Sequence, residues 1–151
     1  MKSLVWVFAL IALLGVAAQA CDSKMNQSNA PILGTYEAEV TAAAIQAAGG
    51  GVAVVAAEEG AWQLEFTKEG QCRLIRLRPV GGPMLEEEVP FHLSGDTLVL
   101  EPRSGELGCF PSEGQGTYRW KLEGEQLTLT AIEDHCYRQF ALTVNPWIKT
   151  R

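Results

Sequence analysis

A series of short segments, in which apolar and polar residues alternate and glycine-containing turns intervene, constrains the fold most strongly. Trp62, Leu64 and Phe66 alternate with polar neighbours. Residues 68–71 are then predicted to form a turn, and 72–78 a returning strand. Three pairs of such segments can be recognised: 60–66 with 72–78, 86–93 with 96–101, and 117–122 with 126–132. The segments 34–40 and 140–144 are predicted as the first and the last strand. Side chains on a β-strand point alternately to its two faces, and short turns join antiparallel neighbours. The pattern therefore predicts a meander of hairpins.

The remaining segments predict little helical structure. Residues 42–48 are rich in alanine and predict one short helix, with Thr41 as its N-cap and the glycines 49–51 as its end. The apolar run 52–57 is interpreted as a strand or a buried loop, and 133–138 as a helical turn. About seven or eight strands close most easily into a small up-and-down β-barrel, because closure removes exposed edges. A two-sheet β-sandwich is the alternative.

The first residues have the features of a secretory signal. Lys2 precedes an apolar run from Leu4 to Val16, and small residues then lead to Cys21. The run is shorter than the roughly 20 apolar residues of a membrane-spanning helix. We therefore predict a signal peptide over 1–20, a polar tether over 21–33 and one barrel domain over 34–151.

The residues at the end of this signal also indicate an anchor. The sequence Ala18-Gln19-Ala20-Cys21 resembles a bacterial lipobox, although Ala18 stands where leucine is usual. Acylation of Cys21 would give the multi-chain attachment that stable membrane anchoring requires. Cleavage by ordinary signal peptidase, without a lipid, is the alternative. In either case we expect an exported protein, and with the lipid an extracytoplasmic protein of the cell membrane or cell envelope.

Charge and cysteine content narrow the functions further. The formal net charge is −6, which disfavours binding to nucleic acid. Export places the cysteines in an oxidising compartment, where a disulfide is expected. Cys109 and Cys136 both lie at the ends of predicted elements, so we predict that they pair. Cys72 lies within a predicted strand and is left as a small, partly buried residue.

Two stretches carry a family resemblance. Gly60-Ala61-Trp62, at the head of a predicted strand, resembles the Gly-x-Trp signature of lipocalins and other calycins. The stretches 116–122, 127–129 and 134–138 resemble a C-terminal signature of lipocalin-like domains in bacterial exported proteins and lipoproteins, which mostly have no assigned function. The resemblance implies a lipocalin-like barrel in which Arg138 packs over Trp62.

Few side chains suggest a catalytic or metal-binding site. Cys109, His135 and Cys136 could approach a zinc ion, but adjacent ligands fit a tetrahedral site poorly, and a disulfide is favoured. Asp134 is interpreted as a helix N-cap. The run Glu86–Glu88 is predicted to be a solvated face, and Arg76 and Arg78 are predicted to be exposed, with lining of the barrel mouth as the alternative. We predict no metal, no cofactor and no enzymatic activity.

The aromatic residues leave two functions open. Trp62, Phe66, Tyr118 and Trp120 are most simply core residues, but a barrel of about eight strands can also hold one small ligand between such side chains. The first hypothesis is a membrane-tethered binding module for a small apolar ligand. The alternative is a structural or protein-interaction lipoprotein of the cell envelope with a filled barrel.

Overall fold

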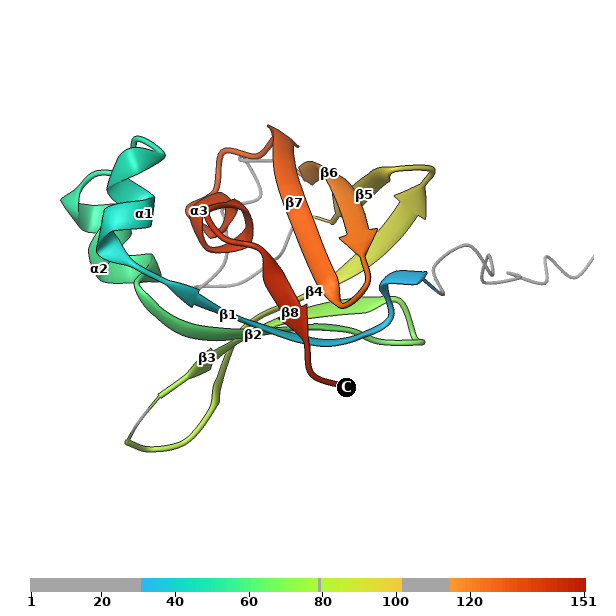
Figure 1. Ribbon diagram of the computed structural model, residues 1–151, viewed down its shortest axis with the longest axis horizontal. Coiled ribbons are helices and arrows are strands. Elements are labelled where there is room, and N and C mark those ends of the chain that lie inside the picture. Colours follow the sequence, from blue (N-terminus) through green and yellow to red (C-terminus); the bar gives the residue numbers. More distant parts are fainter. Residues whose placement is uncertain (1–30, 79, 102–114) are drawn as a thin grey trace, which may run out of the picture.

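The computed structural model describes residues 31–78, 80–101 and 115–151, which form a closed barrel of eight antiparallel strands (Figure 1). Each strand pairs with its neighbours in the sequence, and the last strand pairs with the first. The strands are β1 (Gly34–Val40), β2 (Gly60–Phe66), β3 (Gln71–Leu77), β4 (Met84–Ser94), β5 (Thr97–Leu100), β6 (Gly116–Glu123), β7 (Gln126–Glu133) and β8 (Trp147–Lys149). The predicted up-and-down barrel is thus confirmed.

Three short helices accompany the strands: α1 (Ala42–Ala47), α2 (Val52–Glu58) and α3 (Arg138–Thr143). The prediction of α1 was correct, and the Thr41 hydroxyl accepts a hydrogen bond from the Ala44 amide at 3.2 Å. The interpretation of 52–57 as a strand or buried loop was wrong. In α2, Val54 and Glu58 lie four residues apart on the buried face, so packing overrides the strand preference of valine.

The last strand was also misplaced. Residues 138–143 form α3, whose buried residues Arg138, Ala141 and Leu142 have the three- and four-residue spacing of a helical face. The predicted strand over 140–144 and the helical turn over 133–138 are therefore wrong. Strand β8 follows Pro146, and it closes the barrel by pairing with β7 and with β1.

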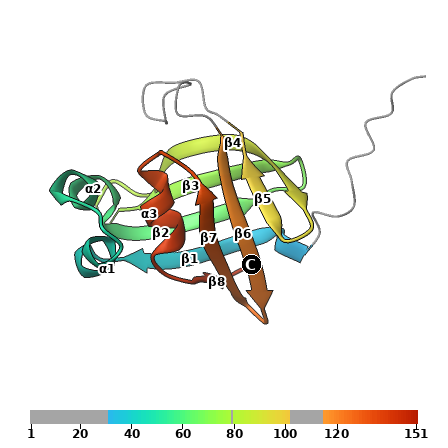
Figure 2. The same cartoon turned by 90° about the horizontal axis from the view of Figure 1, so that it is seen from above.

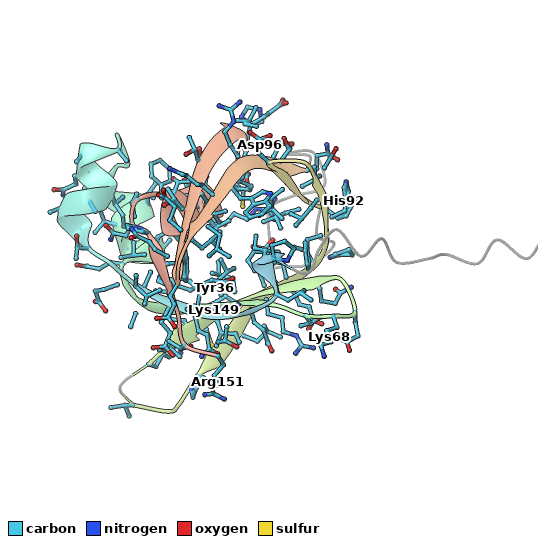
Figure 3. All side chains as sticks on the ribbon, turned by 45° about the vertical axis from the view of Figure 1, so that its right-hand side comes forward. Tyr36, Lys68, His92, Asp96, Lys149 and Arg151 are labelled. Carbon is cyan, nitrogen blue, oxygen red and sulfur yellow. The ribbon has the colours of Figure 1, made fainter. Side chains whose placement is uncertain are left out.

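The two ends of the barrel differ. Because the strands alternate in direction, the short turns 67–70, 95–96 and 124–125 gather at one end, here called the turn end. Lys68 and Asp96 belong to two of these turns (Figure 3). The longer connections 41–59 and 134–146, and residues 78 and 80–83 between β3 and β4, lie at the opposite end, called the loop end. Figures 1 and 2 show α1 and α2 there, away from the start of β1.

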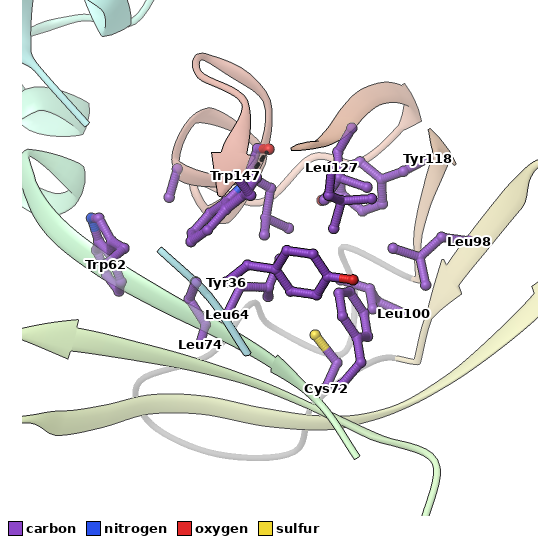
Figure 4. Close-up of a cluster of buried hydrophobic side chains, with 14 of the residues drawn as sticks. Tyr36, Trp62, Leu64, Cys72, Leu74, Leu98, Leu100, Tyr118, Leu127 and Trp147 are labelled. Atoms are coloured by element: carbon purple, nitrogen blue, oxygen red, sulfur yellow. Dashed lines mark hydrogen bonds between the residues drawn. The ribbon is translucent and has the colours of Figure 1, made fainter. Parts of the chain in front are cut away.

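Side chains from all walls of the barrel meet in one core. Figure 4 shows Tyr36, Leu64, Leu100 and Leu127 converging from four different strands. Tyr36 is fully buried, and its hydroxyl donates to the Ile32 carbonyl at 2.9 Å, which fixes the entry of the chain at the turn end. The core is therefore continuous across the barrel.

Candidate functional site

The aromatic residues predicted to contact a ligand mostly belong to the core. Trp62 and Phe66 are 2 % exposed and Tyr118 is fully buried. Trp120 is partly exposed, and its indole donates to the Gly95 carbonyl at 3.1 Å at the turn end. The structure does not bring these four side chains together around one large cavity in the part of the chain that it describes. Their role as ligand contacts stays a prediction.

One cavity between these core side chains is small. A cavity of about 10 Å³ lies among apolar side chains of β2 to β5 and α3, beside one carboxylate. Its lining comprises Leu64, Cys72, Leu74, Glu87, Val89, Leu100 and Leu142. This volume accommodates about one water molecule. The side chain of Leu142 reaches in from α3, so this helix helps to fill the barrel.

A buried ion network lies between α3 and the strands. The Arg138 Nε donates to Oδ2 of Asp134 at 2.8 Å, and its Nη1 donates to Glu87. The Tyr118 hydroxyl donates to the same Asp134 oxygen, whose partner Oδ1 accepts from the Cys136 amide at 2.8 Å. The side chains of Arg138, Glu87 and Asp134 are 3 %, 8 % and 2 % exposed. The network ties α3 to β4 and β6 across the barrel.

This network corrects two sequence predictions. Glu87 is buried, although the run Glu86–Glu88 was expected to be a solvated face. Asp134 is not the N-cap of α3, because Tyr137 has that position, and it is an ion-pair partner instead. The signal for Glu87 was present, since it continues the inward row of Val89 and Phe91 at every second residue.

The surroundings of Arg138 favour its charged form. Burial by itself lowers the pKa of the Arg138 guanidinium, but the charge of Glu87 and the bond to Asp134 outweigh burial and raise it overall. Burial and the neighbouring Asp134 charge raise the pKa of the Tyr118 phenol. Gly116 is needed beside them, because a Cβ at this position would lie 2.7 Å from the Arg138 Nη2. The contacts of Arg138, Asp134 and Tyr118 thus hold α3 against the barrel wall.

The cation that covers Trp62 is not the one that was predicted. The guanidinium of Arg76 lies 4.1 Å from the Trp62 ring centre, whereas Arg138 is held in the network described above. Arg76 pairs with Glu86 at 3.0 Å, and it donates to the carbonyls of Ala57 and Glu59. Its predicted exposure is therefore wrong, whereas Arg78 is exposed as expected. Arg76 fastens the end of α2 onto β2 and β3.

A buried carboxyl group lies beside this contact. Glu58 ends α2 with 8 % exposure, and its Oε2 has no hydrogen-bond partner among the described residues. Its carbonyl accepts from the Trp62 indole at 2.8 Å. Burial raises the pKa of Glu58 to about 7, while Arg76 opposes and Glu86 and Glu87 reinforce this rise. The group changes charge near neutrality.

An open groove of about 570 Å³ lies on the outside of the barrel, where β1 meets the connection from α3 to β8. Its lining mixes carboxylates with apolar side chains: Glu37, Ala38, Glu39, Ala61, Trp62, Leu77, Asn145, Pro146 and Ile148. Glu39, Ala61 and Leu77 are paired across three strands and so share one face. The sequence did not predict this groove, because only the strand register brings these residues together.

The cysteine predictions are only partly covered by the structure. Cys72 is buried and has a free thiol, whose pKa is raised by burial and by the charge of Glu87. It is more deeply buried than expected. Cys109 and the predicted lipidation residue Cys21 lie outside the described residues, as does the predicted signal peptide. The pairing of Cys109 with Cys136 therefore stays a prediction.

In comparisons with protein-family models, with curated proteins and with solved structures, no significant match to this chain was found. The closed eight-strand barrel is compatible with a lipocalin-like fold and with a binding module. Among the described helices, none has the length and apolarity required to cross a bilayer. Evidence for function therefore has to come from the filled interior, the buried network and the outer groove.

Proposed function

We propose that this protein is a lipid-anchored, extracytoplasmic barrel of the cell envelope that binds a partner protein on its outer surface. The observation that carries the proposal is the dense packing of the described interior, where the core side chains are almost fully buried. The space between Leu64, Leu100 and Leu142 has room for about one water molecule. The buried ion pairs of Arg138 with Glu87 and Asp134 lie beside this space. A barrel whose described core is packed in this way can still present its outer wall to a partner.

The predicted anchor supports the same reading. Acylation at Cys21 would attach the chain to a membrane through the tether that precedes β1. The chain enters the barrel at the turn end, and the loop end lies on the far side from that entry (Figure 1). The groove extends from Glu37 and Ile148 toward Asn145 and Pro146 of the loop end. Long connections and the surfaces next to them commonly carry binding functions in proteins.

Site-specific photo-crosslinking in the envelope of the source cells tests this proposal. A photoreactive amino acid placed at Ala61 or Ile148, in the groove, is expected to give one protein adduct of constant mass. The same group at Thr128, an exposed position of β7, is the matched control and is expected to give none. The absence of an adduct at the groove, or equal adducts at all three positions, would contradict the proposal.

A further inference from the structure

We propose that the groove between β1 and β8 binds a partner segment in which lysine or arginine side chains stand beside apolar ones. This inference rests on the proposed function and adds the chemistry of the partner. The groove is open and has apolar walls made by Leu77 and Ile148, of which Ile148 is 50 % exposed. An apolar segment would therefore remove apolar surface from water at both walls.

The charges at the groove indicate a cationic partner. No lysine or arginine of the described chain forms an ion pair with Glu37 or Glu39, and Glu39 is exposed. Glu37 accepts only a hydrogen bond from Gln63, at 3.3 Å. Two carboxylates beside an apolar surface are complementary to cations on a partner, and such complementarity mainly provides specificity and fast association.

Acidic residues on the adjoining strands differ from Glu37 and Glu39, because they form ion pairs with arginines of the chain. Glu65 and Glu88 both pair with Arg73, at 3.4 and 3.3 Å. Glu86 pairs with Arg76 at 3.0 Å. The outer wall of β2 to β4 thus supplies its own cations, whereas the groove beside β1 is left with uncompensated negative charge. A second copy of this chain, with its formal net charge of −6, is a poor occupant by comparison.

The pairing of β1 suggests how such a segment could lie. On the β8 side, β1 pairs only at Tyr36 and Glu37, so its continuation from Ala38 to Val40 has no strand partner there within the described residues. The Asn145 side chain donates to the Glu39 carbonyl at this place. An extended segment could therefore lie along this part of β1. Glu37, Glu39, Leu77 and Ile148 share the outer face, so its lysine and apolar side chains would have to point to the same face, every second residue.

A peptide-binding experiment with the purified mature protein, the chain from Cys21 onward, tests the inference. The probe is a short fluorescein-labelled peptide of repeating Lys-Ser-Ile-Ser, which places lysine and isoleucine on the same face of an extended chain. Binding is followed by fluorescence anisotropy. We expect saturable binding that weakens as salt rises from about 0.05 to about 0.3 M, because exposed charges are screened. Peptides with glutamate in place of lysine, or serine in place of isoleucine, are expected not to bind.

Variants of the protein locate the site. The double change Glu37→Gln and Glu39→Gln is expected to weaken binding by about 2- to 30-fold, the range for losing two exposed charge pairs. Ile148→Ser, which removes apolar surface from the groove wall, is also expected to weaken it. The matched control is Glu123→Gln with Glu125→Gln, an equal change of charge at the turn end, which is expected to leave binding unchanged.

Three results would overturn the inference. These are no binding of the lysine–isoleucine peptide, equal loss in the groove and control variants, and self-association through the groove in sedimentation experiments. A crosslinked partner at Ala61 or Ile148 combined with no peptide binding would reject the cationic chemistry but leave the proposed function standing. The absence of any crosslinked partner would reject the proposed function itself, whatever the peptide result.

Discussion

Replacing Arg138 by methionine is expected to lower the free energy of unfolding by about 3–5 kcal/mol, measured by urea denaturation at pH 7. The change leaves the carboxylates of Glu87 and Asp134 buried without their cation, and breaking a buried pair on one side has this cost. Methionine keeps much of the volume of arginine, so the loss reports mainly on charge.

Two further variants make this test specific. Arg119→Met removes an exposed arginine whose pair with Asp96 is 68 % and 69 % exposed, and it should change stability by less than about 0.5 kcal/mol. Adding Glu87→Gln to Arg138→Met should restore part of the loss, because one buried charge disappears. If Arg138→Met lowers the free energy of unfolding as little as Arg119→Met does, the buried network does not contribute to stability in the way proposed.

Glu58 should make the protein less stable as the pH rises toward neutrality. Its pKa is about 7 in the folded chain and near 4.5 without burial, so the folded state holds a proton more tightly. Stability is therefore expected to fall as the pH rises from about 4.5 to 7, by about 3 kcal/mol in total, and then to level off. Glu58→Gln stays neutral and should remove this fall.

Urea denaturation at pH 4 and pH 8 measures the effect. Glu58→Gln should match the original protein at pH 4 and be more stable than it at pH 8. Glu125→Gln, in the exposed β6–β7 turn, is the control and should follow the original protein at both values. Equal pH dependence in the Glu58→Gln variant and the original protein would mean that Glu58 ionises freely in the fold.

The barrel could be predicted from the sequence because its strands carry a strong local signal. Trp62, Leu64 and Phe66 alternate with polar residues in β2, and short glycine turns join three pairs of neighbouring strands. The helices were harder to predict. In α2 and α3, short apolar runs have no distinctive period, and only their packing against the barrel decides between helix and strand.

The buried network was missed for a different reason. Acidic residues are usually exposed, so Glu87 was interpreted as part of a solvated face and Asp134 as a helix N-cap. The alternation of β4 already placed Glu87 on the inward face, and Arg138 stands four residues after Asp134. Both clues become meaningful only when strand and helix positions are known together.

The residue that covers Trp62 shows the limit of a family resemblance. Gly60 and Trp62 do begin a barrel strand, as the resemblance implied. The covering guanidinium, however, comes from Arg76 on the neighbouring strand, because Arg138 is held by Glu87 and Asp134. The resemblance thus located the tryptophan correctly but not its partner.

Mass spectrometry of the protein purified from its own cell envelope tests the central claim, a filled and lipid-anchored barrel, most directly. Apart from any bound partner protein, the native and the denatured protein are predicted to have the same mass, equal to the chain from Cys21 plus its acyl groups. A stoichiometric small-molecule mass that is lost on unfolding would contradict the filled barrel, and an unmodified Cys21 would contradict the anchor.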